Sequence, residues 1–366
     1  MALMFSQSGP QRYISDETAY DILPDYFHEL GLKTVVFLHG EKGYAAAKPY
    51  LPEWPADVNV IDTPFNGECS YEEIDRIKQL CADQNADAIM ALGGGKCLDT
   101  AKSTANGTKL AQIMLPTLAS NCAAWSALSV HYKENHEHID HKIYLRTSEL
   151  LLVNPKVIFN SPIDYFVAGI GDTLAKFYES ERVFENLKPE EFTDALIISQ
   201  KMAKQCKDIL LEYGEQAVDD MKNGNYNEEW RQVTETIIVT AGTVGGWGDA
   251  YARATAAHPV CDALTSFPRT HNHLHGAKVA YGIFVMLALE GQEDDLKALL
   301  PFYQHIGLPT NLSDVDFSDA TPEEMDQLVA EITAPNTQIH LLPATDVSPE
   351  AVHRAINRVE ELTQAS

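Results

Sequence analysis

A run of three glycines between an apolar segment and a helix-forming segment constrains this chain more than any other feature. Residues 93–102 read GGGKCLDTAK and follow the apolar residues 88–92. The pattern predicts a buried strand that turns through Gly93–Gly95, with positive φ at the glycines, into a helix that begins near Cys97. Such a turn offers backbone N–H groups and the positive end of a helix to an anion. Because the spacing matches neither GxxxxGK[ST] nor GxGxxG, an empty glycine turn is the alternative.

Short apolar runs recur throughout the first half of the chain, with helix-forming stretches such as 71–84 between them. The runs cover residues 34–38, 58–61, 88–92, 112–115 and 150–153. Strands that alternate with helices predict a parallel sheet covered by helices. Ligands bind such sheets at the carboxyl ends of the strands, where the glycine loop, Gly40–Glu41 and Pro116–Thr117 all fall.

Helical periodicity replaces the strand pattern in the second half. Buried-type residues recur at three- and four-residue steps at 192, 196, 199, 203, 206 and 210. Asn154–Pro155 and Ser161–Pro162 mark the change of character. We therefore expect an α/β domain over residues 1–161 and a helical domain over residues 162–366.

The charge and the cysteines narrow the partners and the compartment. The 366 residues include 27 basic and 53 acidic side chains, for a net charge of -26, which argues against nucleic acid or an anionic membrane as partner. The six cysteines are scattered, as in a reduced cytoplasmic protein. The N-terminal stretch from Met1 lacks a signal-peptide pattern and no apolar run has membrane-spanning length, so we expect an unprocessed cytoplasmic protein.

Two segments of the second half carry candidate metal ligands. Gly169-Ile-Gly-Asp172 places a carboxylate at the start of a probable helix, and His258 and the cluster His271, His273 and His275 follow later. One carboxylate and two imidazoles suit zinc or ferrous iron. Spacing alone leaves open which of the three clustered histidines is the ligand, and a helix cap or surface histidines are the alternative. Cys261 is a further possible ligand, and a polar hairpin is the alternative to metal binding for the histidine-rich stretch 136–141.

Taken together, the motifs resemble those of the glycerol dehydrogenase branch of the iron-containing (type III) alcohol dehydrogenase family. The matching segments are Asn66–Ser70 with Glu73–Arg76, the glycine loop, Pro116–Thr117, Ser126–Val130, Gly169–Asp172 and His275–Gly282. The resemblance implies a Rossmann-like N-terminal dinucleotide-binding domain and an all-α C-terminal metal-binding domain, the architecture of dehydroquinate synthase, with the active site between them. It also implies that Asp172, His258 and His275 bind one divalent metal, with zinc favoured and iron the alternative.

The same resemblance implies a nicotinamide dinucleotide site in the first domain. The expected site residues are Gly94, Gly95, Lys96, Asp99, Thr117, Ser120, Ser126, Leu128 and Tyr132. Glu41 follows the strand at 34–38, where a carboxylate accepts from both ribose hydroxyls, which favours NAD. Lys42 beside it would instead meet a 2′-phosphate, so NADP is the alternative. We expect the metal to polarise the substrate oxygen while hydride passes to or from the nicotinamide.

Departures from the glycerol dehydrogenase pattern indicate the substrate. Cys122 stands where these enzymes have an aspartate, Trp125 adds apolar bulk, and Lys176 lies one helical turn after Asp172. A cation beside the metal suits a 2-hydroxy or 2-oxo acid better than a neutral triol, and this loop resembles that of hydroxycarboxylate dehydrogenases. For Lys176, exposure to solvent or pairing with Glu179 is the alternative.

Other functions remain open at this stage. Glycerol oxidation to dihydroxyacetone is the second candidate, and a lyase like dehydroquinate synthase is the third. A non-catalytic binding protein is disfavoured because the three metal-ligand candidates are intact. By analogy with the family we expect a homo-oligomer, either a dimer or an octamer.

Overall fold

The computed structural model describes residues 4–364, which form two compact units. One unit spans Gln7–Pro162, and the other comprises residues 4–6 and the described residues from Ile163 to Gln364. The sequence placed the domain boundary after Ser161. Met1–Leu3, part of the stretch read for a signal sequence, lie outside the described residues.

A six-stranded parallel sheet forms the centre of the N-terminal unit, in the order β1-β8-β5-β4-β2-β3. Its strands are β1 (Arg12–Ser15), β2 (Thr34–His39), β3 (Asn59–Pro64), β4 (Ala88–Gly93), β5 (Ala111–Pro116) and β8 (Leu150–Val153). Five of them were predicted as apolar runs. No strand was predicted at β1, because its sequence RYIS is not an apolar run.

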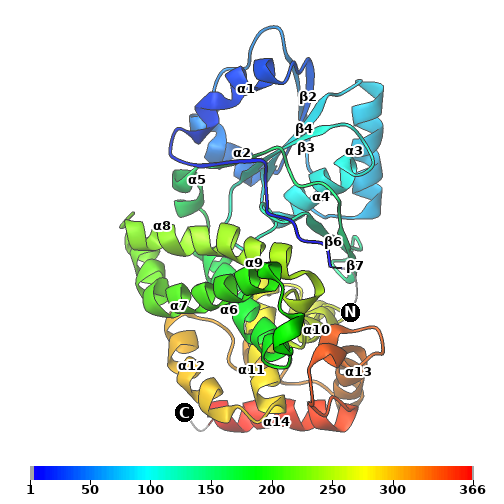
Figure 1. The fold of residues 1–366 in the computed structure, drawn as a ribbon, viewed down its shortest axis with the longest axis vertical. Coiled ribbons are helices and arrows are strands. Elements are labelled where there is room, and N and C mark those ends of the chain that lie inside the picture. The colour runs from blue at the N-terminus through cyan, green and yellow to red at the C-terminus, as the bar shows by residue number, and fades with distance from the viewer. Residues whose placement is uncertain (1–3, 365–366) are drawn as a thin grey trace. The chain divides into compact units, whose positions relative to one another are not determined.

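Helices cover both faces of this sheet. They are α1 (Leu23–Glu29), α2 (Glu41–Ala47), α3 (Tyr71–Asp83), α4 (Gly95–Ala105) and α5 (Pro155–Phe159). Leu23 and Phe27 of α1 share one buried core with Val35 and Phe37 of β2. α3 and α4 lie next to each other on the opposite flank (Figure 1). Strands buried on both faces explain why the sequence shows continuous apolar runs instead of alternation.

A two-stranded antiparallel hairpin follows β5. It consists of β6 (Leu128–Tyr132) and β7 (His138–Ile143). The histidine-rich stretch 136–141 therefore forms the turn and strand of a polar hairpin, which was the alternative to a metal site.

The C-terminal unit is helical. Its helices are α6 (Ile163–Glu185), α7 (Asp194–Asn223), α8 (Glu228–Glu235), α9 (Ala241–Gly248), α10 (Ala257–Leu264), α11 (His275–Leu289), α12 (Glu293–Ile306), α13 (Pro322–Ile332) and α14 (Pro349–Gln364). Leu196, Ser199, Ala203, Cys206 and Leu210 form a buried face of α7, as their spacing predicted, whereas Phe192 precedes the helix, whose N-cap is Thr193. The α/β unit and the helical unit confirm the expected fold class.

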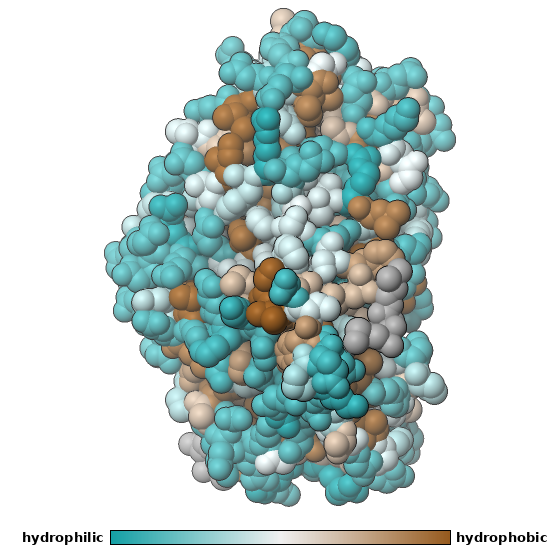
Figure 2. Space-filling view, viewed as in Figure 1, coloured by the Kyte–Doolittle hydropathy of each residue, from teal (hydrophilic) through white to brown (hydrophobic). Residues whose placement is uncertain are grey.

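The visible face of the molecule is mainly polar (Figure 2). On the face shown in Figure 2, hydrophilic residues predominate and apolar residues form small separate groups. Within residues 4–364, no helix combines the length and the apolar character needed to cross a membrane.

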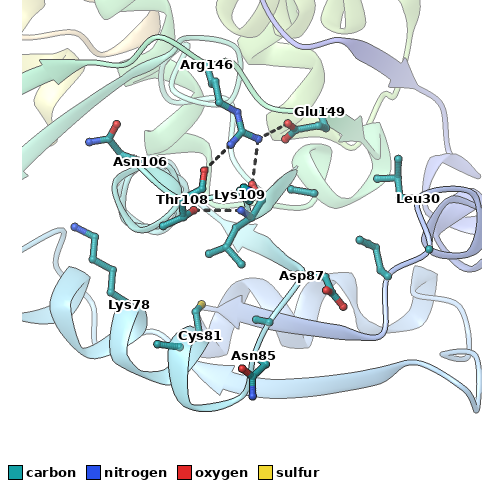
Figure 3. A pocket seen from close by; sticks show the side chains of 16 residues that line it. Leu30, Lys78, Cys81, Asn85, Asp87, Asn106, Thr108, Lys109, Arg146 and Glu149 are labelled. Atoms are coloured by element: carbon teal, nitrogen blue, oxygen red, sulfur yellow. Dashed lines mark hydrogen bonds and ion pairs between the residues drawn. The ribbon is translucent and has the colours of Figure 1, made fainter.

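A surface pocket lies at the amino ends of β2, β4 and β5. Figure 3 shows Arg146 among the lining residues; its guanidinium donates to the carbonyl oxygens of Thr108 and Leu110 and contacts Glu149. The Arg146 guanidinium is thus bound to neighbouring groups of the protein itself. The pocket also lies at the opposite edge of the sheet from the glycine loop, so it is not the site that the sequence predicted.

Candidate functional site

Two helices of the C-terminal unit approach each other closely because glycines lie at their contact. A Cβ atom at Gly276 of α11 would lie 1.9 Å from the carbonyl oxygen of Ala168 in α6. A Cβ at Gly171 of α6 would lie 2.7 Å from the carbonyl oxygen of Gly276. Any larger residue requires a backbone to move. The close contact brings Asp172, on α6, next to His275, the first residue of α11.

The position of Asp172 within its helix corrects the sequence-based expectation. The glycines at 169 and 171 were expected to open a helix, but α6 already begins at Ile163. Asp172 therefore projects from the middle of a long helix. The glycines permit close contact between two helices. In the sequence, such glycines look the same as glycines at a helix start.

His258 of α10 completes a cluster with Asp172 and His275. The Nε2 atoms of His258 and His275 lie 3.6 and 3.4 Å from Oδ1 of Asp172. One ligand atom from each residue lies within 4.8 Å of the others. Among the three clustered histidines that the sequence could not separate, the structure places His275 here.

A buried carboxylate that the sequence did not single out holds His258 from the other side. Glu179 of α6 is 1% exposed, and its Oε2 lies 2.5 Å from Nδ1 of His258. Its Oε1 accepts from the backbone N–H groups of Thr255 and His258 at 2.8 and 3.2 Å. His258 thus lies between two carboxylates, Asp172 at Nε2 and Glu179 at Nδ1.

These contacts shift the ionisation of the cluster. Burial opposes the charge on Asp172, but Lys176 and the two histidines outweigh it and hold the pKa of the carboxyl well below its usual range. Burial also opposes a charge on His258, but Glu179 and Asp172 raise the pKa of its ring to about 9. The pKa of His275 is raised well above its usual value despite burial, through Cys261 and Asp172. The cluster without a metal is therefore an array of alternating charges.

The other histidines and Cys261 have different neighbours. Cys261 Sγ lies 3.4 Å from Nδ1 of His275, on the side of the ring away from Nε2. His271 Nε2 bonds the carbonyl oxygen of Thr265, and His273 Nε2 bonds Asp316. Neither ring joins the group formed with Asp172.

Lys176 is buried one turn after Asp172 on α6, with 9% of its surface exposed. Burial raises the pKa of Asp172, and the charge of Lys176 is the largest effect that lowers it. The same charge contributes to the lowered pKa of Glu179. A buried ammonium thus lies near the metal-ligand candidates. This burial argues against a solvent-exposed amine, whereas the effect on the Glu179 pKa agrees with the other alternative, pairing with Glu179.

In the N-terminal unit, the loops after β2, β4 and β5 meet at the carboxyl edge of the sheet. The Gly40 N–H donates to the carbonyl oxygen of Leu92, and the Thr117 N–H donates to that of Gly93. Glu41, the first residue of α2, is exposed beside this junction. The edge thus gathers the three loops expected from the sheet topology.

The glycines at 93–95 differ from the prediction in their backbone conformation. None of them has positive φ, and α4 begins at Gly95, earlier than expected, with Gly94 as its N-cap. At each position a side chain from another residue lies so close that only glycine fits. A Cβ would lie 2.7 Å from Cβ of Cys97, 2.7 Å from Cδ1 of Leu118 and 2.9 Å from Nδ2 of Asn121, respectively. The glycines let the loop after β5 lie directly against the start of α4.

Lys96 lies at this helix start and has two neighbours. Its Nζ is 2.5 Å from Oε2 of Glu68 and 4.9 Å from the ring centre of Tyr132. Glu68 also contacts Nδ1 of His136 at 2.6 Å. Lys96 and Tyr132 are therefore adjacent, and Glu68 is the group with which an anion would compete for the ammonium.

Asp99 faces the protein interior. Its carboxylate accepts from the Val130 N–H at 3.0 Å and lies 2.8 Å from Nζ of Lys102. Lys102, which the sequence did not single out, is 3% exposed and donates to the carbonyl oxygens of Ala123, Ser126 and Leu128. This buried pair fastens the segment that runs from the β5 loop into β6.

That segment carries the remaining predicted residues of this unit. Ser120, Cys122 and Ser126 lie in the loop, partly exposed, and Leu128 begins β6. The Cys122 carbonyl oxygen accepts from the N–H groups of Trp125 and Ser126, so the loop turns tightly at this point.

Trp125 packs against the start of the unit. Its ring lies edge-on to Tyr13, with 5.5 Å between centroids, and its indole lies against Gly9, where a Cβ would come within 2.3 Å of it. These contacts account for the tryptophan without a substrate. The expected role as a substrate wall stays a prediction.

Comparisons with known proteins agree with this arrangement. Residues 10–155 match the profile of iron-containing alcohol dehydrogenase. The chain is 36% identical over 357 residues to hydroxycarboxylate dehydrogenase A of Escherichia coli K12, covering 96% of each chain. It is 34% identical over 366 residues to a glycerol dehydrogenase of Pseudomonas putida, covering 97% of each. A crystal structure of a probable glycerol dehydrogenase from Sinorhizobium meliloti 1021 superposes with a TM-score of 0.89 at 26% identity and covers all of both chains.

The similarity extends across both units, well beyond the segment that the family profile matches. The chain therefore belongs to the iron-containing alcohol dehydrogenase family, whose members are metal-dependent oxidoreductases that act on alcohol groups.

Proposed function

We propose that this protein is a NAD-linked dehydrogenase that interconverts a small 2-hydroxy acid and the corresponding 2-oxo acid with the help of a divalent metal. The observation that carries the proposal is the cluster of Asp172, His258 and His275, whose ligand atoms lie within 4.8 Å of one another. Residues from three helices separated in sequence converge on one point, which is how protein metal sites are built.

The donor set fits a catalytic zinc. It offers one carboxylate oxygen and two imidazole nitrogens, and three protein ligands leave a coordination position for a substrate oxygen. Ferrous iron accepts the same donors, so it is the alternative. A divalent metal would supply Lewis acidity toward the substrate oxygen, and a bound nicotinamide would supply or accept the hydride.

The protein's own residues prepare these partners. Asp172 is held ionised by Lys176 and the histidines despite its burial, so it is ready to act as a ligand. Lys176 brings a positive charge close to Asp172 without belonging to the ligand set. A substrate carboxylate next to the reacting carbon would find a partner in that ammonium.

The dinucleotide is assigned to the carboxyl edge of the sheet. The N-terminus of α4 and its glycines suit a pyrophosphate, and Lys96 and Thr117 lie at the same edge. Glu41 is placed to accept from ribose hydroxyls, which supports NAD; Lys42 beside it keeps NADP as the alternative. Gly94, Gly95, Ser120, Ser126, Leu128 and Tyr132 complete the proposed site. Asp99 contributes to this site indirectly, because it pairs with Lys102, which holds the segment that carries Ser126 and Leu128.

The substrate preference rests on Lys176 and Cys122. Cys122 removes the charged hydroxyl acceptor expected in a polyol enzyme, and Lys176 adds a cation. The relative named hydroxycarboxylate dehydrogenase A supports this choice. Glycerol is the second candidate, supported by the relatives named glycerol dehydrogenase.

Steady-state assays of the purified protein test the proposal. We expect NADH-dependent reduction of 2-oxobutyrate, inhibited by chelators, and weaker oxidation of glycerol with NAD. Lys176→Ala should reduce turnover of 2-oxobutyrate far more than turnover of glycerol. If the wild type does not reduce 2-oxo acids, or if the variant reduces them equally well, the assignment of substrate fails. A strong preference for NADPH would overturn the role of Glu41, and product formation without net change in NADH would indicate a lyase.

We also expect a homo-oligomer. Light scattering coupled to size-exclusion chromatography would distinguish a dimer or octamer from a monomer.

A further inference from the structure

Glu179 is the one buried carboxylate that touches a metal-ligand candidate without belonging to the ligand cluster, among the residues the structure describes. It lies seven residues after Asp172 on α6, so both carboxylates project from the same face of that helix. Asp172 faces Nε2 of His258, whereas Glu179 faces Nδ1 of the same ring.

Both oxygens of Glu179 have defined partners. Oε1 accepts from the backbone N–H groups of Thr255 and His258, and Oε2 lies 2.5 Å from Nδ1 of His258. An ionised carboxylate can only accept hydrogen bonds, so Nδ1 must be the donor. In a neutral imidazole the proton then resides on Nδ1, and Nε2 carries the free lone pair.

We propose that Glu179 is a positioning residue that fixes the proton of His258 on Nδ1 and thereby presents Nε2 as a metal ligand. The inference rests on the proposed function, because it assumes that the cluster binds a metal. Nothing in the spacing of the sequence indicates this role, since Glu179 and His258 are 79 residues apart. A ligand histidine held in this way is both oriented and made more basic.

A purely structural role is the competing explanation. Glu179 fastens residues 255–258 to α6 through two backbone N–H groups, and this alone would stabilise the fold. The two explanations differ in what happens when the carboxylate becomes an amide of the same size.

Glu179→Gln separates them because an amide has only one acceptor oxygen. If that oxygen serves the two backbone N–H groups, the NH₂ group faces Nδ1 and forces the ring proton onto Nε2, which can then no longer bind a metal. The opposite orientation would direct the NH₂ group at two backbone donors. The variant thus keeps the packing of the wild type while favouring the wrong tautomer.

The experiment measures metal binding directly. Metal-free wild type and Glu179→Gln are titrated with Zn²⁺ in competition with a chelating dye, and the visible spectrum of each is recorded at saturating Co²⁺. We expect the variant to bind Zn²⁺ about 10- to 100-fold more weakly. We also expect its Co²⁺ ligand-field bands to shift while the far-UV circular dichroism of the metal-free protein stays that of the wild type, which shows that the variant is folded.

Glu290→Gln is the matched control. Glu290 is a buried carboxylate in the same unit, with 3% of its side chain exposed, and it pairs with Arg182 near the C-terminal end of α6, outside the ligand cluster. Its variant should bind Zn²⁺ and Co²⁺ as the wild type does. Glu179→Asp provides a second test that retains the charge: the shorter side chain cannot maintain both sets of contacts, so we expect a smaller but measurable loss of Zn²⁺ affinity.

The outcomes are distinguishable. A wild type that binds Zn²⁺ at one site per chain, with Glu179→Gln showing the same affinity and the same Co²⁺ spectrum, overturns the positioning role and leaves the proposed function intact. A wild type without such a site overturns the proposed function and, with it, this inference. If Glu179→Gln does not fold, Glu179→Asp decides: unchanged Zn²⁺ affinity in that variant also refutes the role.

Discussion

The backbone of Gly276 lies against the carbonyl oxygen of Ala168 so closely that a methyl group at position 276 would sit 1.9 Å from that oxygen. The first residue of α11, His275, is held beside Asp172 by this contact. The relative position of two of the three members of the ligand cluster therefore depends on a residue that has no side chain.

Gly276→Ala should destabilise the C-terminal unit and weaken metal binding together. The added methyl group must push α6 and α11 apart, and overpacking of this kind costs about 1–3 kcal/mol or more. Urea unfolding of the metal-free variant and its Zn²⁺ affinity check both effects.

Gly245→Ala is the control for this substitution. A Cβ at Gly245, within α9, would meet only the Arg253 side chain at an ordinary 3.5 Å. Because alanine is also the better helix former, this variant should be as stable as the wild type or slightly more stable. Equal stability losses in the two variants would mean that the contact between Gly276 and Ala168 is not special.

Much of the fold could be predicted because its signals are local. Five strands of the sheet contain short apolar runs, and the glycine, proline and threonine residues that follow several of them mark the edge where a ligand is expected. β7 has the polar sequence HIDHKI and therefore shows no apolar run. It pairs with β6, and its Asp140 accepts hydrogen bonds from Tyr71 and His131.

Parts of the candidate site could not be predicted because they depend on long-range contacts. Glu179 meets Thr255 and His258, and Lys102 meets carbonyl oxygens more than twenty residues away. No spacing rule connects such partners. Gly93–Gly95 lead into the helix start that was predicted, but they also make room for the loop after β5. Gly171 was read as part of a helix start, whereas it makes room for α11. Only the folded chain supplies these approaching segments.

Lys102→Met should destabilise the N-terminal unit. The variant leaves the Asp99 carboxylate buried without its cation and three carbonyl oxygens without their donor, and breaking a buried pair typically costs about 3–5 kcal/mol. Urea unfolding measures the loss. The exposed Lys78→Met serves as control and should change stability by less than about 0.5 kcal/mol.

The double variant Asp99→Leu/Lys102→Met tests whether the charges themselves matter. Removing both charges avoids an unpaired buried ion, so the double variant should be more stable than Lys102→Met alone. If it is less stable by the full sum of the two single effects, Asp99 and Lys102 do not act as a pair. NAD binding, followed by quenching of tryptophan fluorescence, should weaken in both variants because the segment that carries Ser126 and Leu128 is no longer fastened.

Replacing Asp172, one of the three proposed metal ligands, should abolish metal binding with little change in fold. Asp172→Asn keeps the size of the side chain but removes the charge that both histidines face. We expect metal analysis of the purified variant to give almost no zinc and dehydrogenase activity to fall to background. Retention of one zinc per chain in this variant would place the metal elsewhere.

The metal-free protein should lose stability as the pH rises from about 6.5 to above 9. The ring of His258 has a pKa of about 9 in the folded protein, against about 6.5 when unfolded. A raised folded pKa contributes stability that is fully present below the unfolded value and disappears as the pH passes the folded value; we expect a loss on the order of 2 kcal/mol.

Zn²⁺ requires the neutral His258 ring, so the Zn²⁺ affinity should increase over the same pH range. Thermal unfolding from pH 6 to pH 10, with chelator or with Zn²⁺, measures both effects. In His258→Asn the decline of the chelated protein should be smaller, and an equal decline in the variant would show that other groups cause it.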